Sequence, residues 1–388
     1  MAITLDGTSG ITTPGITASS GDIAATTLSV DGNNINATNG INFRNRIING
    51  DMRIDQRNAG ASVTVSSNNS AWSADRFRFD SPADQSMTFQ QQTSVVPPGF
   101  TYALKVTAGT ATSNTNNQPA LCHFIEGYNT ADFNSGTASA KTITLSFQVY
   151  SSLTGTFGVC FENNAGNRAY IASYTINIAN TWETKTITIT CDTSGTWNTT
   201  NLRGMSVFFD LGYGTNFSAA ASSAWANLSS VRGLTGGVKL AANTGATWYI
   251  TGVQLEVGSV ATPFERRPYG MELALCQRYY AKSFLQGTAP AQNVGSFAGA
   301  TGIISVNPST RVLMDVYLPV VMRAAPTVTF FNPSAANAQA RDASASADCS
   351  STGTFTVGDR NFVISTVGSG SSTQGNGLSV HWTANIEL

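Results

Sequence analysis

The sequence predicts an all-β protein with an extended N-terminal segment, an antiparallel β-sandwich or jelly roll, a short linking helix and a C-terminal β-sandwich. The first reason is that several segments alternate apolar and polar residues with a period of two, which is typical of antiparallel strands with one solvated face. The second is that Ser, Thr, Asn and the 36 Gly residues dominate the composition and favour strands and turns over helices. This composition excludes a helical bundle, a coiled-coil rod and a doubly wound nucleotide-binding fold as the main body of the chain.

The charge and hydropathy of the 388-residue chain exclude further classes. The net charge is -1 and no long basic run occurs, so we do not expect nucleic-acid binding. Hydrophobic residues make up 41% of the chain, which is too many for a disordered protein. No run of 18 apolar residues is present, so we expect no membrane insertion. The first residues lack the basic and apolar regions of a signal peptide, which indicates synthesis in a cytoplasm.

The five cysteines indicate reduced, partly buried thiols. They are odd in number, widely spaced and without a CxxC pair, which argues against a disulfide framework and against a zinc site. We therefore predict no metal site of this kind and no cofactor. The cysteines are Cys122, Cys160, Cys191, Cys276 and Cys349.

Residues 1–45 form a first region with its own composition. No Lys or Arg precedes Arg44, and Phe43 is its only aromatic residue. One copy of such a segment buries too little apolar surface to offset its ordering entropy. Two interpretations remain open: a disordered tail, or a segment that becomes ordered only against other chains, by β-pairing or by wrapping a partner.

Residues 46–265 are predicted to form one long β domain. Gly and Asn turns separate many alternating strands, which indicates a sandwich or jelly roll. The clearest alternating sets of apolar residues are Ile143, Leu145, Phe147 and Val149; Ile187 and Ile189; Met205, Val207, Phe209 and Leu211; and Val253, Leu255 and Val257.

Residues 266–284 contain the one convincing helix, and residues 285–388 return to β patterning. Pro268 and Gly270 fit a helix start. We expect Met271, Leu275, Cys276 and Tyr279 to share the apolar face of this helix. Alternation at 312–318 and 378–386 predicts two strands of a C-terminal module, with a long exposed loop over 332–352 between them.

Several strings in this order resemble tail fibre proteins of tailed bacteriophages, from about residue 46 to the end of the chain. They are IINGDMRIDQR at 47–57, ADRF at 74–77, GVQLEVG at 252–258 with ATPFE at 261–265, ELALCQRYY at 272–280, LPVVMRAAPTVT at 318–329 and HWTANIEL at 381–388.

The resemblance implies a carbohydrate-binding-like jelly roll at 46–265, a helical linker at 266–284 and a C-terminal receptor-binding knob at 285–388. It implies a homotrimeric fibre located in the virion tail. The N-terminal segment 1–45 would attach to phage tail or baseplate proteins, and the knob would bind a host surface glycan or protein. Two alternatives stay open: a tailspike-type enzyme that degrades surface polysaccharide, and a virion decoration or baseplate protein without a receptor role.

Aromatic side chains outside clean strands are candidates for stacking on sugar rings, because Tyr and Trp offer an apolar face and a polar edge. The candidate loop for receptor contact is the polar one in the C-terminal module, since exposed loops on a rigid scaffold often carry binding. The stacking candidates are Trp72, Tyr128, Tyr213 and Trp225, with Trp197 as a further candidate. The receptor-binding candidates are Asn337, Gln339, Arg341 and Asp342.

Catalysis and metal binding have weaker support in the sequence. Glycoside hydrolysis needs a pair of carboxylates, and no acidic residue lies in a recognisable motif, so we predict that the protein is not an enzyme. The concentration of charge at 51–57 and 75–78 predicts a structural salt-bridge network. A calcium site that includes Asp51 and Glu256 is the alternative. We expect His381 to be solvated or to lie in a trimer interface, and His123 to have no metal or nucleophile role.

Overall fold

The computed structural model describes residues 28–30, 33–35, 43–307 and 310–388, and the chain divides into two compact units, 1–41 and 42–388. In the first unit, β1 (Leu28–Val30) pairs antiparallel with β2 (Asn33–Ile35). The rest of the predicted attachment segment up to residue 42 lies outside the described residues. Everything that follows concerns the second unit.

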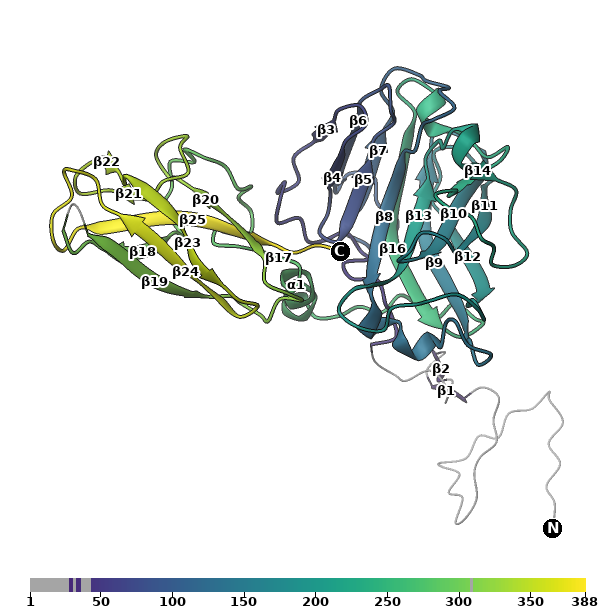
Figure 1. Ribbon diagram of the computed structural model, residues 1–388. Helices are drawn as coiled ribbons and strands as arrows, with labels where there is room; N and C mark the ends of the chain where they lie inside the picture. Colours follow the sequence, from purple (N-terminus) through teal and green to yellow (C-terminus); the bar gives the residue numbers. More distant parts are fainter. Residues whose placement is uncertain (1–27, 31–32, 36–42, 308–309) are drawn as a thin grey trace, which may run out of the picture. The chain divides into compact units, whose positions relative to one another are not determined.

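The larger part of this unit is a sandwich of two six-stranded antiparallel sheets (Figure 1). Both sheets combine strands that lie far apart in the sequence. Sheet I contains, in spatial order, β11 (Ala169–Ile176), β10 (Gly155–Asn163), β13 (Arg203–Asp210), β8 (Ala120–Glu126), β5 (Phe77–Asp80) and β4 (Ser70–Trp72). Sheet II contains β12 (Glu183–Thr190), β9 (Thr142–Ser151), β16 (Thr247–Val257), β7 (Ala103–Thr107), β6 (Met87–Gln92) and β3 (Val63–Val65).

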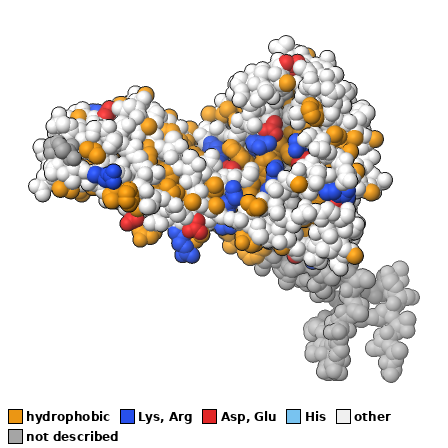
Figure 2. Space-filling model, in the orientation of Figure 1, with side chains coloured by type: hydrophobic (Ala, Val, Ile, Leu, Met, Phe, Trp, Pro, Cys, Tyr) orange, Lys and Arg blue, Asp and Glu red, His pale blue; other side chains and the backbone are white. Residues whose placement is uncertain are grey.

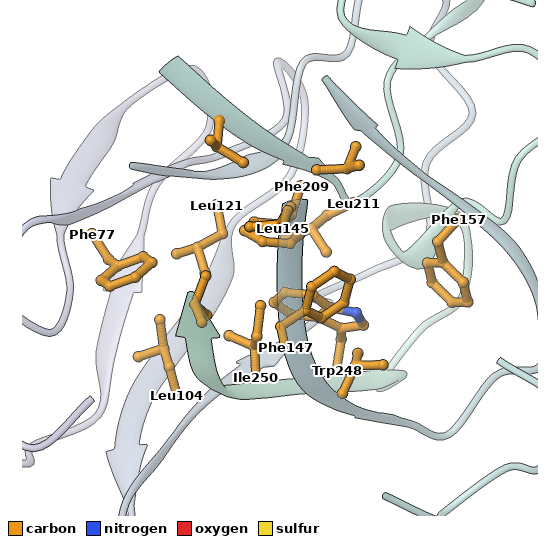
Figure 3. Packing of buried hydrophobic residues seen from close by; sticks show 14 of the residues in the cluster. Phe77, Leu104, Leu121, Leu145, Phe147, Phe157, Phe209, Leu211, Trp248 and Ile250 are labelled. Atoms are coloured by element: carbon orange, nitrogen blue, oxygen red, sulfur yellow. The ribbon is translucent and has the colours of Figure 1, made fainter. Parts of the chain in front are cut away.

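The main core lies between the two sheets and is rich in aromatic side chains (Figure 3). Phe147 of β9 packs edge-on against Phe209 of β13, with ring centroids 5.2 Å apart. Trp248 is fully buried, and its indole Nε1 donates a hydrogen bond to the hydroxyl of Tyr174 at 3.2 Å. Because burying each such side chain contributes ~1.5–3 kcal/mol, the alternation seen in the sequence is sufficient to specify which face of each strand points inward.

Sheet I differs from the half-buried sheet that the alternation predicts, because both of its faces are buried around β13. Met205, Val207 and Phe209 point into the main core as expected. Phe208, expected on the solvated face, is only 1% exposed. The reason is the connection 211–246, which covers the outer face of the sheet. It contains η3 (Thr215–Phe217), β14 (Ser218–Ala219), β15 (Gly233–Leu234) and η4 (Leu240–Ala242).

Strand β16 carries a bulge next to the end of the sandwich. Its register with β9 shifts between Thr251 and Gln254. Gly252 has a φ of +61°, and a Cβ at this position would lie 2.7 Å from Cζ of Phe100. Both the left-handed backbone and the close approach of the ring require glycine here.

The helix α1 (Tyr269–Gln277) lies within the predicted range 266–284 but is shorter. Pro268 precedes it, as the start signal predicts. Residues after it are extended, because Tyr280–Lys282 form β17 and pair with the last strand. Cys276 and Tyr279 are buried as expected. The placement of Met271 on the apolar face was wrong, since it is 39% exposed and the buried side chain on that turn is Glu272.

The C-terminal module is a second, smaller sandwich arranged around one long strand. That strand is β25, which pairs with β17, β18, β20 and β21 along its length. A three-stranded sheet packs against this first sheet, and the two enclose a separate core. The first sheet contains β17 (Tyr280–Lys282), β18 (Thr301–Ile304), β20 (Thr327–Phe331), β21 (Arg341–Asp342), β22 (Ala347–Asp348) and β25 (Gly377–Asn385). The second contains β19 (Arg311–Tyr317), β24 (Asn361–Val367) and β23 (Ser351–Val357).

The predicted salt-bridge network is present and is mostly buried. Arg57 lies 3.7 Å from Asp75 and 3.0 Å from Glu387. Arg76 also pairs with Glu387 and is only 1% exposed. The charges near 51–57 and 75–78 therefore join the first sandwich to the last residues of the C-terminal module, a connection that the sequence did not predict.

Candidate functional site

A surface groove of about 590 Å³ lies beside β11 and β12, the strands at one edge of sheets I and II. Its volume falls in the range typical of small-ligand sites. Three segments that are distant in the sequence contribute to it: the start of β11, the end of β12 with the turn after it, and the connection that covers sheet I. The residues that line it are Arg168, Tyr170, Thr188, Ile189, Thr190, Cys191, Asp192, Thr193, Ser194, Ser223, Ala224 and Trp225.

Aromatic rings form one side of the groove. Tyr170 and Trp225 line it directly, with ring centroids 5.7 Å apart and planes at 62°. Trp197 packs edge-on against Trp225 at 5.1 Å. The indole Nε1 of Trp225 donates a 2.7 Å hydrogen bond to the carbonyl oxygen of Thr190, which fixes the orientation of the ring. Both lining rings are half-buried, so each keeps part of its surface in contact with solvent.

Arg168 organises the polar side of the groove. Its Nε and Nη2 donate to the two carboxylate oxygens of Asp192 at 2.6 and 2.8 Å. Its Nη1 donates to Oδ1 of Asn227 at 2.8 Å, and Nη2 also donates to Oγ of Ser194 at 3.0 Å. Such bidentate pairs fix geometry as well as charge. The guanidinium thus ties three separate loops together.

The electrostatics of this pair favour the charged forms. The hydrogen bond to Asp192 raises the pKa of Arg168. Burial acts to raise the pKa of Asp192, but hydrogen bonds from Arg168 and Ser194 outweigh it, and the net pKa is lowered. Asp192 therefore stays ionised and accepts hydrogen bonds, which leaves it unsuited to act as a proton donor near neutral pH.

The turn after β12 is shaped to approach Arg168 closely. Gly195 has a φ of +79°, and a Cβ on it would lie 2.8 Å from Cγ of Arg168. The backbone carbonyl of Ser194 accepts a 3.2 Å hydrogen bond from the indole of Trp197. Taken together, the groove offers aromatic faces, a fixed ion pair and a rim of threonine and serine hydroxyls, the combination that suits a polyhydroxylated ligand.

Of the stacking candidates taken from the sequence, the structure places Trp225 in this groove with Trp197 packed against it, and Trp72, Tyr128 and Tyr213 elsewhere. Trp72 is half-buried on β4, with the guanidinium carbon of Arg57 5.4 Å from its ring centroid. Tyr128, in η1 (Gly127–Asn129), is 61% exposed. Tyr213 is only 1% exposed and belongs to the cluster on the outer face of sheet I, so its ring offers no surface to a ligand in this structure.

The groove residues that sequence reasoning missed are Arg168, Tyr170 and Asp192. Tyr170 alternates within a strand and so resembles a core residue. The pairing of Arg168 with Asp192 joins residues 24 positions apart. The one sequence signal for this groove is the Ser-Gly turn at 193–195, which follows the end of a strand. Side chains from a neighbouring sheet edge can converge at such a turn.

Three of the receptor-binding candidates of the C-terminal module form hydrogen bonds with neighbouring residues of the same module. The predicted exposed loop over 332–352 contains β21 and β22, and Asp342 within it is fully buried and accepts a hydrogen bond from Asn376 at 2.9 Å. Asp348 accepts hydrogen bonds from Asn337 at 2.7 Å and from Arg341 at 3.0 Å. Gln339 is half-buried. Of these four candidates, only Asn337 is exposed, and its amide is already engaged.

The remaining chemistry-bearing residues are also engaged in packing. His381 was expected to be solvated or at a trimer interface; it is instead 1% exposed and stacks on Phe284 with centroids 4.0 Å apart. Asp51 pairs with Arg53 at 3.4 Å, and Glu256 accepts hydrogen bonds from Thr262 at 2.7 and 2.8 Å. Within residues 28–30, 33–35, 43–307 and 310–388, no group of three or more His, Cys, Asp or Glu side chains could hold a metal ion. All five cysteines are free and buried, whereas the sequence predicts thiols that are only partly buried.

Comparisons with known proteins find only distant structural similarity and do not assign a function. No protein-family model and no curated protein matches the chain. Three similar solved structures are the enzymatically active domain of tailspike protein 4 from bacteriophage CBA120 (10% identity, TM-score 0.29, 55% of this chain and 21% of that one), a family 4 carbohydrate-binding module (16%, 0.28, 55% and 99%) and discoidin II of Dictyostelium discoideum (10%, 0.17, 85% and 96%). No helix of the described residues is long and apolar enough to cross a membrane.

Proposed function

We propose that this protein is a glycan-binding tail fibre of a bacteriophage, a structural protein of the virion that acts by binding and not by chemistry. Residues 1–45 would attach a homotrimer to phage tail or baseplate proteins, and the rest of the chain would face the host surface. The ordered strings that resemble tail fibre proteins support the virion assignment. The groove with Tyr170 and Trp225 above Arg168 and Asp192 is the observation that carries glycan binding.

The groove is a stronger receptor candidate than the loop at 337–342. In the groove, two rings retain exposed surface and hydroxyl groups line the rim. At the loop, the amide of Asn337 and the guanidinium of Arg341 already bind Asp348. A ligand at the loop would have to replace these internal hydrogen bonds, whereas a ligand in the groove would displace only water. Three copies would raise avidity without strong individual sites.

Binding without cleavage is favoured by the carboxylates of the groove. Glycoside hydrolysis by the usual mechanisms needs two carboxyl groups placed on either side of the scissile bond. Asp192 is the single acidic residue among those that line the groove, and both of its oxygens accept hydrogen bonds from Arg168. We therefore propose that the protein is not an enzyme.

The test is binding of the purified chain to an array of bacterial surface polysaccharides, followed by calorimetry on the strongest neutral ligand. Trp225→Ala should weaken binding about tenfold or more, as for a central aromatic contact. Ala224→Trp fills the groove from an exposed position without removing any core atom, and should have a similar effect. Tyr128→Ala removes a more exposed ring that lies away from the groove and is the control. Equal affinity of the wild type and all three variants would refute the assignment of this groove as the binding site.

The fibre assignment has its own measurement. Light scattering on the full-length chain should give a mass near three chains, and the purified protein should compete with phage adsorption. A monomer that does not compete would leave a decoration protein without a receptor role.

A further inference from the structure

A second surface, on the outer face of sheet I, combines aromatic rings with guanidinium groups. Trp72 on β4, Phe124 on β8 and Phe208 on β13 form a row across the sheet, with ring centroids 6.2 and 6.0 Å apart. Phe124 and Phe208 are buried, yet they point away from the main core. The side chains that cover them therefore lie on the outer face of sheet I.

Arginine side chains cover these two rings. The guanidinium carbons of Arg78 and Arg203 lie 4.7 and 4.8 Å from the centroid of Phe124. That of Arg232 lies 4.6 Å from the centroid of Phe208. Stacking on a ring holds a guanidinium flat and leaves its N–H edges free to bind an anion, as aromatic-supported arginines do in recognition sites.

Two of the three guanidinium groups have a carboxylate partner. Arg78 lies 2.8 Å from Asp80, and Arg232 lies 2.9 Å from Glu162. Neither arginine is sealed off, since the side chains of Arg78 and Arg232 are 30% and 21% exposed.

Arg203 is the third and lacks such a partner. In the part of the chain that the structure describes, no carboxylate lies within 4.0 Å of its guanidinium nitrogens. Its guanidinium donates hydrogen bonds to neutral oxygens, at 3.3 Å to Asn164 and 3.5 Å to Ser206. Burial lowers the pKa of Arg203, the charge of Glu162 acts against this, and the charges of Arg78 and Arg232 act in the same direction as burial. Of the three arginines, Arg78 and Arg232 each form an ion pair, with Asp80 and Glu162, and Arg203 forms none within 4.0 Å among the described residues.

The position of this surface also suits a ligand. Figure 2 shows basic and acidic side chains gathered in a hollow of the larger sandwich, beside hydrophobic surface and over strands of sheet I. Low-dielectric walls around a charged cleft strengthen its field on an approaching ion. Guanidinium groups match the planar, bidentate geometry of carboxylates and the oxygens of phosphates.

We propose that Arg203, together with Arg78 and Arg232, binds an anionic group carried by a sugar, a carboxylate or a phosphate, on the outer face of sheet I. This inference rests on the proposed glycan-binding function but uses a different surface from the Trp225 groove. The protein would therefore prefer acidic surface polysaccharides, with the anion on sheet I and neutral residues of the polymer at the groove or elsewhere.

The test uses defined probes. Oligogalacturonate supplies carboxylates, and its methyl ester is the neutral counterpart; mannose 6-phosphate and mannose form the matched pair for phosphate. We expect the chain to bind one or both anionic probes at least about tenfold more tightly than the neutral member of the pair, with affinity that falls as salt is raised. Equal binding of each anionic probe and its neutral counterpart would overturn the inference.

Variants then place the site. Asn164→Asp supplies a carboxylate beside Arg203 from an exposed position, so it should neutralise the site without removing packing and weaken anionic binding about tenfold. Arg203→Gln should do the same. Arg311→Gln removes the same charge from an exposed arginine in the C-terminal module, 5.8 Å from the ring of Phe355, and should change nothing. Anionic binding that is indifferent to Asn164→Asp would overturn the placement.

The groove at Trp225 and the anion site on sheet I can be refuted independently of each other. The Ala224→Trp variant, whose groove is filled, should still bind the anionic probes. If that variant abolishes all binding while Asn164→Asp has no effect, the groove stands and the sheet I site is refuted. If neither neutral nor anionic probes bind any form of the chain, the glycan-binding function itself is refuted.

Discussion

Glu387 is the ion-pair partner on which two buried arginines depend, and its replacement gives the sharpest stability prediction. Arg57 Nη2 donates to Glu387 Oε1 at 3.0 Å, and Arg76 Nη1 donates to Oε2. The side chains are 11%, 1% and 6% exposed for Arg57, Arg76 and Glu387. Arg76 has no other carboxylate within ion-pair distance among the described residues, whereas Arg57 also lies 3.7 Å from Asp75. Removing the charge of Glu387 therefore leaves Arg76 buried and uncompensated.

The expected cost follows from this geometry. Breaking a buried pair by removing one partner costs ~3–5 kcal/mol, because the remaining ion keeps its desolvation penalty. Two charge-assisted hydrogen bonds at ~1.5–3 kcal/mol each give a similar value. Glu387→Gln conserves shape and removes only the charge, so we expect it to lower the free energy of unfolding by ~3–5 kcal/mol.

The assay is guanidinium-induced unfolding followed by tryptophan fluorescence, with Asp132→Asn as the matched control. Asp132 forms a 2.8 Å pair with Arg46, but the side chains are 45% and 24% exposed. An exposed pair contributes at most ~1 kcal/mol, so the same carboxylate-to-amide change should have little effect there. Equal midpoints for the two variants would refute the reasoning that burial of the Arg76 pair controls its contribution.

Three further predictions concern strain, protonation and reactivity. Gly252→Ala should lower the free energy of unfolding by ~1–3 kcal/mol, because its Cβ would meet Phe100. Gly236→Ala, at a φ of +75° with open space around it, should lower it by only ~1 kcal/mol. Unfolding curves that rank the two variants the other way would contradict the steric argument. Burial lowers the pKa of Lys282 to about 8, so the unfolded state binds more protons than the folded state between about pH 8 and 10.5. The free energy of unfolding of the wild type should therefore rise with pH across that window, relative to that of Lys282→Met. A difference between the two proteins that does not change with pH would contradict this prediction. The five cysteines should react slowly with a thiol reagent in the folded protein and completely after unfolding, because all are buried; fast reaction of the native chain would show an opened core.

The all-β class and the inward faces of the strands could be predicted because both depend on local alternation. Ile143, Leu145, Phe147 and Val149 all lie in the core as their spacing indicates. The burial of Phe208 could not be predicted in the same way, since it depends on the connection 211–246 folding back over the sheet. The buried face of the short helix was likewise decided by a distant partner: Glu272 is buried because Oε1 accepts a hydrogen bond from the backbone N–H of Asn49 at 2.6 Å.

The candidate site was predictable only in part for the same reason. Trp225 stands out in the sequence as an aromatic residue outside a strand. Its neighbours in the groove come from the start of β11 and the end of β12, and no local pattern marks Tyr170 or Asp192 as different from core or turn residues. Residues that a fold brings together across 24 or more positions carry no joint signal in a single sequence.

Five of the strings that resemble tail fibre proteins, and the last strand, contact one another in one region of this structure. They converge where the first sandwich, the helix and the last strand join, through buried ion pairs and backbone hydrogen bonds. The contacts between them are Gly50 with Val253, Asn49 with Glu272, Gln56 with Asp75 and Tyr280, Arg57 and Arg76 with Glu387, and Arg323 with Ile386 and Glu387. Buried polar networks are intolerant of partial change, because each unpaired member costs the full desolvation penalty. The residues that carry the resemblance therefore lie mainly where the first sandwich, the helix and the last strand contact one another. The groove at Trp225 and the arginines over sheet I, Arg78, Arg203 and Arg232, lie outside these strings.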